Sequence, residues 1–202
     1  MYLMDNNWSK AEHYALRSKE FNRMNLSADH VLMVVYRKTG QPDKAKAIID
    51  PLLEDLPLYH AARFENYLLN RMDEKDFGSL IRNELPFEIY MELAEWYEAV
   101  GCNEEALTLL SFAENYPIAA YKKAWLLHKS GDEAGSMIAL EKANAQSPEV
   151  VFPFRPTSLK ALEWAKTIRP DWKISYYEGL IYWVNQDKAK ALALFEGCSG
   201  AN

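Results

Sequence analysis

The chain has 202 residues, 49% of them hydrophobic, and its 23 Lys and Arg against 29 Asp and Glu give a net charge of −6. Because binding to a phosphate backbone requires clustered Lys and Arg, this acidic balance argues against a nucleic-acid partner. With only 8 Gly and 9 Pro among long stretches of Ala, Leu, Glu and Lys, the composition excludes a loop-rich or all-β chain and predicts an all-α fold.

A pattern with a period of about 34 residues predicts pairs of antiparallel helices along the chain. It is clearest over 26–57, where Gly40 makes the turn between two helices and Ser27 is the expected N-cap of the first. The residues at the recurring positions of this unit are Leu32, Met33, Tyr36, Gly40, Ala45, Ile49, Leu52 and Pro57. This unit sets the phase for the rest of the chain.

The first 25 residues fit the same pattern as a partial unit. Tyr2 and Ala11 lie 34 residues before residues of the same type, Tyr36 and Ala45, which places Asn6 at the turn position. We therefore expect the chain to open about ten residues into a repeat and to be a fragment of a longer chain, without its native N-terminus. The alternative is a native start whose first helix matches by phase alone.

Four further units follow with uneven spacing. The expected units span 58–86, 87–117, 118–148 and 157–202, with a non-helical insert at 147–157. Three prolines in SPEVVFPFRPTS exclude a continuous helix from this insert. Gly101 and Gly131 hold the turn position in their units, whereas Gln186 holds it in the last unit.

These residues resemble the tetratricopeptide repeat family. The string YRKTGQPDKAKAIIDPLLEDLP matches most of the family's diagnostic positions, although the early Trp is missing. In the last unit, Gly179 with Tyr182 matches G-x-x-Y, and Ala191 with Phe195 matches A-x-x-x-F. The resemblance implies an α-α superhelix of irregular helical hairpins, which acts as a non-catalytic scaffold for protein binding.

Residue types that carry chemistry form no catalytic or metal-binding pattern. None of His13, His30, His60 and His128 has a second ligand at metal spacing. Cys102, expected to be exposed after the turn, has no neighbouring base to activate it. We therefore expect no enzyme activity, no metal and no cofactor.

The helical phase also predicts an inner, concave face that combines an acidic band with an aromatic band. Its expected members are Glu88, Met91, Glu92, Glu95, Tyr121, Trp125, Tyr176, Tyr177 and Trp183. Tyr and Trp anchor binding sites because each buries a large area at a low cost in entropy. We expect this face to bind a protein, a peptide or another domain of the same chain. The alternative is that some of the rings pack under the insert.

The C-terminal third suggests a second function. The strings VVFPFRPTSLKALEWA and DWKISYYEGLIYWVNQDKAKALALFEGC resemble the C-terminal repeat region of large bacterial proteins of unknown function that carry a sugar-mutarotase-like β-sandwich. This resemblance implies an accessory helical arm of a carbohydrate-handling protein. A self-assembly module is a third possibility, and the sequence leaves the oligomeric state open.

Targeting signals are absent from the sequence. No apolar run has the length needed to cross a membrane, and no signal-peptide pattern follows Met1. The two widely separated cysteines form neither a disulfide framework nor a zinc motif, which suits a reducing compartment. We expect no membrane partner and slightly favour the cytoplasm, although the compartment is unknown from sequence.

Overall fold

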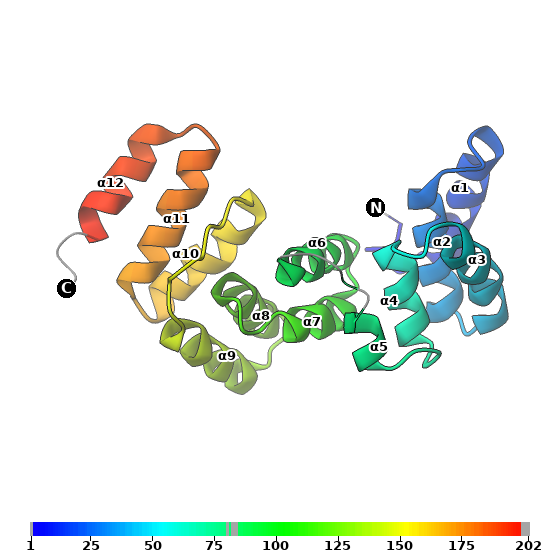
Figure 1. Cartoon of the computed structure of the whole chain (residues 1–202), viewed down its shortest axis with the longest axis horizontal. Coiled ribbons are helices and arrows are strands. Elements are labelled where there is room, and N and C mark those ends of the chain that lie inside the picture. The colour runs from blue at the N-terminus through cyan, green and yellow to red at the C-terminus, as the bar shows by residue number, and fades with distance from the viewer. Residues whose placement is uncertain (1, 80, 82–84, 199–202) are drawn as a thin grey trace. The chain divides into compact units, whose positions relative to one another are not determined.

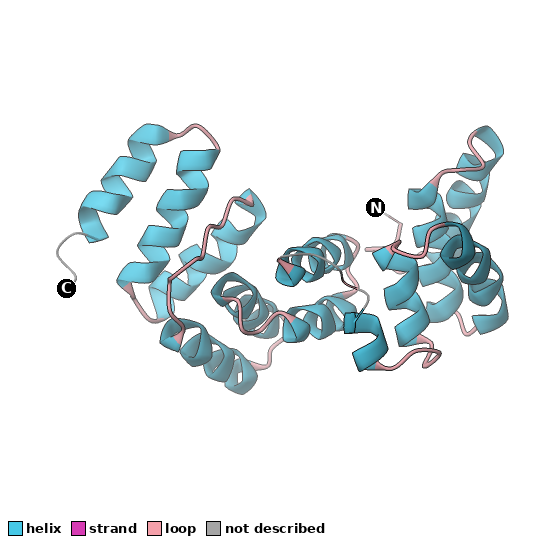
Figure 2. Ribbon diagram, in the orientation of Figure 1, coloured by secondary structure: helices cyan, strands magenta, loops and turns pink. Residues whose placement is uncertain are grey.

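The computed structural model describes residues 2–79, 81 and 85–198 (Figure 1). In this part of the chain the regular elements are helices joined by loops, without a strand (Figure 2), which confirms the predicted all-α fold. The helices are α1 (Trp8–Phe21), α2 (Leu26–Lys38), α3 (Pro42–Asp55), α4 (His60–Leu68), α5 (Glu74–Ser79), α6 (Pro86–Ala99), α7 (Asn103–Phe112), α8 (Pro117–Lys129), α9 (Glu133–Ala145), the 3-10 turn η1 (Pro156–Ser158), α10 (Leu159–Ile168), α11 (Trp172–Val184) and α12 (Lys188–Cys198).

The chain divides into two compact units. Unit 1 comprises Met1–Ile89 and Trp96–Cys102, and unit 2 comprises Tyr90–Glu95 and Asn103–Asn202. Helix α6 therefore contributes its two ends to unit 1 and its middle to unit 2.

Most helix starts follow local sequence signals. Asn25 caps α2, because its side-chain oxygen accepts a hydrogen bond from the backbone N–H of Ala28 at 3.1 Å. The predicted N-cap, Ser27, lies instead inside the first turn of this helix. Helices α3, α6 and α8 begin with proline, which is favourable there because the first N–H groups of a helix have no intrahelical partner.

The same closing turn recurs six times in the described residues. The residues in left-handed conformation at these turns are Asn6, Gly40, Asn70, Gly101, Gly131 and Gln186, with φ values from 51° to 86°. At each turn the left-handed residue donates its N–H to the carbonyl three residues earlier, and the next residue donates to the carbonyl five residues earlier, as Gln41 does to Tyr36 at 2.8 Å. This pair of bonds is the Schellman motif. It confirms all five turn positions taken from the sequence and adds Asn70.

A small, buried residue follows five positions after the left-handed residue in five of these six turns. These residues are Ala11, Ala45, Ala106, Ser136 and Ala191. In the hairpin of α8 and α9, the Ser136 hydroxyl donates to the Ala124 carbonyl at 2.9 Å, so the two helices approach closely at this position. The exception is the exposed Lys75 in the short helix α5, within the expected unit 58–86.

The insert is fastened by polar contacts within unit 2. No helix interrupts the chain between the end of α9 and η1, which agrees with the predicted insert except at its last two residues. The side-chain amide of Asn185 donates to the Phe154 carbonyl at 3.0 Å. Val151 is buried, whereas Val150 and Phe152 are exposed. The insert therefore lies along the surface of unit 2.

Candidate functional site

Three residues of the predicted binding face lie in the core of unit 2. The exposed fractions of Met91, Tyr121 and Tyr177 are 2%, 0% and 1%. The Tyr121 hydroxyl donates to the side-chain oxygen of Asn144 at 2.6 Å, and burial raises the pKa of both tyrosines. The prediction that these three side chains are open to a partner is therefore wrong, because neighbouring helices cover the face on which the helical phase placed them.

The charge of Glu95 is compensated within unit 2. Its carboxylate accepts hydrogen bonds from the Lys122 ammonium at 2.9 Å and from the Thr157 hydroxyl at 2.6 Å. The Arg155 guanidinium adds an ion pair at 3.6 Å. Glu95 therefore anchors the insert, and the predicted acidic band loses one of its charges to this internal role.

The remaining members of the predicted face differ in how far they reach the surface. Glu92 is exposed, and Glu88 is half-buried. The indole of Trp183 is 45% exposed, with the Lys188 ammonium 5.7 Å from its ring centre. Glu92 and Trp183 are the members of the set that are most accessible to a partner.

The other two aromatic residues are half-buried in ring clusters. The Trp125 ring centre lies 5.6 Å from that of Trp164 and 5.7 Å from that of His128. Tyr176 lies between Trp172 and Phe195, at 6.2 and 6.1 Å between ring centres. These contacts hold the two half-buried rings in place and reduce the area that a partner can reach.

Unit 1 contains a groove that the sequence did not indicate. We call it the α1–α2 groove; its volume is about 370 Å³, within the usual range for binding sites. Its lining residues are Tyr2, Leu3, Ala11, Tyr14, Ala15, Ser18, Asn25, Ser27, Ala28, Val31, Trp96 and Val100. None of these side chains carries a charge.

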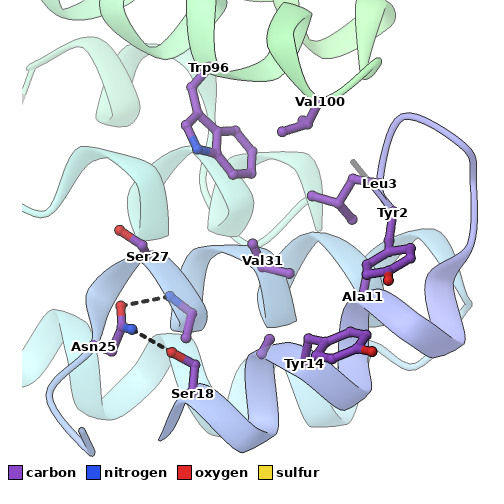
Figure 3. Close-up of a pocket in the computed structure, with 12 residues that line it drawn as sticks. Tyr2, Leu3, Ala11, Tyr14, Ser18, Asn25, Ser27, Val31, Trp96 and Val100 are labelled. Atoms are coloured by element: carbon purple, nitrogen blue, oxygen red, sulfur yellow. Dashed lines mark hydrogen bonds between the residues drawn. The ribbon is translucent and has the colours of Figure 1, made fainter.

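Small residues form the floor of the α1–α2 groove and aromatic residues form its walls. Ala11, Ala15 and Ala28 leave room between α1 and α2. The rings of Tyr2 and Tyr14 stack with centres 5.1 Å apart and planes only 3° apart. Figure 3 shows this pair of rings on the opposite side of the opening from the indole of Trp96.

Polar groups at the edge of the α1–α2 groove are satisfied internally. The Asn25 amide nitrogen donates to the Ser18 hydroxyl at 2.8 Å, and its oxygen caps α2 (dashed lines in Figure 3). Asn25 therefore already uses both its amide nitrogen and its oxygen, and the groove offers mainly apolar contacts.

A buried polar network holds the Trp96 wall. The indole stacks on the His30 imidazole with ring centres 3.6 Å apart. His30 Nε2 lies 3.1 Å from the Tyr97 hydroxyl, which donates to Glu65 at 2.6 Å. The Arg37 guanidinium donates to the same carboxylate at 2.6 and 3.1 Å.

His30 is neutral in this network. Burial, with a smaller contribution from the Arg37 charge, lowers the pKa of His30 to about 3. Because the Tyr97 hydroxyl donates its proton to Glu65, the neutral imidazole donates its Nε2 proton to the Tyr97 oxygen. At neutral pH the Trp96 indole therefore stacks on an uncharged imidazole.

A second depression in unit 1, of about 450 Å³, has a different character. Charged residues line it together with apolar ones, among them Lys19, Arg23 and Asp55. Lys19 is already paired with the buried Asp29 at 2.6 Å. The smaller α1–α2 groove is the better candidate for apolar recognition, because none of its lining residues is charged.

Residues with potential for chemistry are dispersed. Within the described ranges no group of three His, Cys, Asp or Glu side chains could hold a metal ion, and no helix has the length and apolar character to cross a membrane. Cys102, expected to be exposed, is buried at 4% exposure. It directly follows Gly101 at the end of the turn, and its burial keeps the thiol away from solvent.

The residues of the α1–α2 groove lie outside the predicted binding face, whose members all come from later helices. The sequence feature that could have indicated the groove is the pair of small residues Ala11 and Ala15, at positions where the hairpin of α2 and α3 has Ala45 and Ile49.

A comparison of the chain with protein-family models found no match, and a comparison with curated proteins found none either.

Proposed function

We propose that this chain is a non-catalytic helical-repeat scaffold of the tetratricopeptide type, arranged as an α-α superhelix, which binds a protein or peptide. The recurring closing turn followed by a small buried residue supports the repeat assignment. The observation that carries the binding function is the α1–α2 groove, an uncharged recess with paired tyrosines on one wall and Trp96 on the other.

The geometry of the groove favours apolar side chains as its ligand. A partner that enters the groove removes the faces of Tyr2, Tyr14 and Trp96 from water, and aromatic side chains contribute strongly to such contacts. The lining offers no charge to hold a phosphate. Glu92 and Trp183 of unit 2 are accessible side chains that another domain could contact.

Selection of short peptides from a random displayed library, with the whole chain immobilised, tests this function. We expect the selected peptides to converge on sequences rich in apolar residues. Each should bind at least about tenfold more weakly to the Ala15→Phe variant, because the added ring occupies the space that the peptide needs.

A matched control adds the same ring outside the groove. Ile138 is 70% exposed on α9, so Ile138→Phe should leave the affinity of each selected peptide unchanged. Failure of the library to converge, or equal affinities for the chain and the Ala15→Phe variant, would exclude the groove as the binding surface.

A further inference from the structure

The second depression of unit 1 combines apolar walls with charges that are left unpaired. We call it the α1–α3 depression; its volume is about 450 Å³, within the usual range for binding sites. The end of α1, the α1–α2 loop, the start of α2 and the second half of α3 line it. It shares no lining residue with the α1–α2 groove. A ligand of the depression is therefore recognised by a separate set of side chains.

The apolar surface of the α1–α3 depression is open to solvent. Ile48 and Leu52, one turn apart on α3, line it while they pack against the core of unit 1. Two further lining residues are more exposed, Met24 at 77% and Leu56 at 38%. Exposed apolar side chains gathered at a recess are typical of interaction sites, and the flexible Met side chain adapts to what enters. The depression is thus suited to receive an apolar side chain.

The charged residues of the α1–α3 depression divide into an inner pair and two outer groups. Asp29 is only 5% exposed, and its carboxylate pairs with the Lys19 ammonium at 2.6 Å. Arg23 lies in the α1–α2 loop and Asp55 at the end of α3, and neither has a hydrogen-bond or ion-pair partner among the described residues. Because the inner pair neutralises itself, the outer guanidinium and carboxylate are the charges that a ligand can pair with.

The opposite signs of the two outer charges determine the kind of ligand that fits. An anion is attracted by Arg23 and repelled by Asp55, and for a cation the two effects are exchanged. A ligand that carries an acidic and a basic group on either side of an apolar one satisfies both charges. The carboxylate is the natural partner of the guanidinium because the two groups can form paired hydrogen bonds. Side chains of a peptide supply this combination.

We propose that the α1–α3 depression binds a peptide segment of a protein partner in which a large apolar side chain lies between an acidic and a basic residue. The apolar side chain packs on Ile48 and Leu52. The acidic residue pairs with Arg23 and the basic residue with Asp55, so the charges set the direction of the segment across the depression. This site is additional to the α1–α2 groove, and the inference does not rest on the function proposed for that groove.

The probes are peptides selected from a random displayed library on the whole original chain, with any groove-binding peptide added in excess as a competitor. We expect convergence on a large apolar residue between residues of opposite charge. Each peptide should bind Arg23→Glu at least about tenfold more weakly, because an attraction becomes a repulsion. Reversal of the acidic residue of the peptide to Lys should restore its affinity for this variant, which would not follow if the variant had merely lost structure.

Matched substitutions assign the binding to the α1–α3 depression. Asp55→Lys should weaken binding as Arg23→Glu does, and reversal of the basic residue of the peptide to Glu should restore it. Ala47→Phe, at an exposed position of the lining, should weaken binding at least about tenfold because the ring occupies the apolar space. Arg17→Glu makes the same charge change at an exposed position of α1 outside the lining, and Ile138→Phe adds the same ring elsewhere. Both should leave the affinity unchanged.

The outcomes separate this inference from the function proposed for the groove. If the depression variants Arg23→Glu, Asp55→Lys and Ala47→Phe weaken no selected peptide, the inference is overturned. Weakening by Ala47→Phe alone would show a purely apolar site and overturn the charge pairing, and an equal effect of Arg17→Glu would reduce the pairing to non-specific attraction. Peptides that only Ala15→Phe weakens leave the groove standing without this site. Peptides that only the depression variants weaken support this site and exclude the groove.

Discussion

Glu65 in unit 1 and Glu95 in unit 2 each gather several donors from neighbouring segments, yet their surroundings differ. The Glu65 side chain is 0% exposed and accepts from Arg37 and Tyr97. The Glu95 side chain is 17% exposed and pairs with Lys122 and the insert. The buried carboxylate links α4 to α2 and α6, whereas the one near the surface links α6 to α8 and also fastens the insert. The same residue type thus supports the core of one unit and the covering of the other.

The largest expected difference between the two carboxylates is the loss of unfolding free energy when each is replaced by a neutral amide. Glu65→Gln leaves the Arg37 guanidinium beside a neutral amide in the interior, and we expect a loss of about 3 kcal/mol in unfolding free energy. Glu95→Gln should cost less, about 1 kcal/mol, because the Glu95 side chain is itself 17% exposed and the new amide oxygen can still accept from Lys122 and Thr157. Urea denaturation followed by circular dichroism measures both, and amide hydrogen exchange assigns each loss to its unit. Equal losses would contradict the comparison.

The buried network of unit 1 should also make its stability sensitive to acid. The pKa of His30 is lowered from its usual value near 6.5 to about 3 in the folded chain, so the unfolded chain binds the proton first. Neutral His30 therefore contributes fully to the unfolding free energy above about pH 6.5, and this contribution is lost as the pH falls toward 3. Between pH 6 and pH 4 we expect a decrease of roughly 2.5 kcal/mol from this residue.

Urea denaturation at a series of pH values checks this dependence. The His30→Gln variant keeps a side-chain N–H for Tyr97 but does not titrate, so its stability should change less with pH over this interval. His13→Gln, at an exposed position on α1, serves as the control, and its unfolding free energy should depend on pH as that of the original chain does. A His30→Gln variant with the same slope as the original chain would show that other groups carry the acid sensitivity.

The smallest expected difference concerns the closing turns of the two units. In unit 1 α2 closes with Gly40, whereas in unit 2 α11 closes with Gln186 at φ +70°. A side chain at positive φ is unfavourable, so Gln186→Gly should raise the unfolding free energy by about 1 kcal/mol. Gly131→Ala, at φ +86°, should lower it by a similar amount. Thermal unfolding measures the stability of both variants. If Gln186→Gly is less stable than the original chain, the Gln186 side chain makes a stabilising contact that outweighs the cost of its positive φ.

The sequence was most informative where a single residue determines the backbone. Gly40, Gly101 and Gly131 were predicted as turns, and phase alone placed Asn6 and Gln186 in the same role. Asn70 was missed because the region around Tyr67 lacks the small residue that marks the second helix elsewhere. The closing turn needs only a residue that tolerates positive φ, whereas the close helix crossing needs a small one, and α5 has Lys75 instead.

The binding face was less predictable because helical phase tells which side of a helix a residue occupies but not what covers that side. Tyr121 and Tyr177 were assigned to the inner face, and tertiary packing buries both. Glu95 was taken as a surface charge, but the fold brings Lys122 and Thr157 to it. The α1–α2 groove depends on contacts between Trp96 and α2 that lie far apart in the sequence.

The recurring closing turn separates the geometry of the connection from the side chains of the helices that it connects. Its two hydrogen bonds use main-chain atoms only, and they are the same after Gly40 and after Gly131 although the helices on either side differ in sequence. A recombinant chain that crosses over from one of these glycines to the other therefore keeps an intact joint. Because both glycines lie between the two helices of a hairpin, such a crossover joins α2 to α9, and its stability would report how much of a hairpin depends on the turn and how much on the matched packing of its helices.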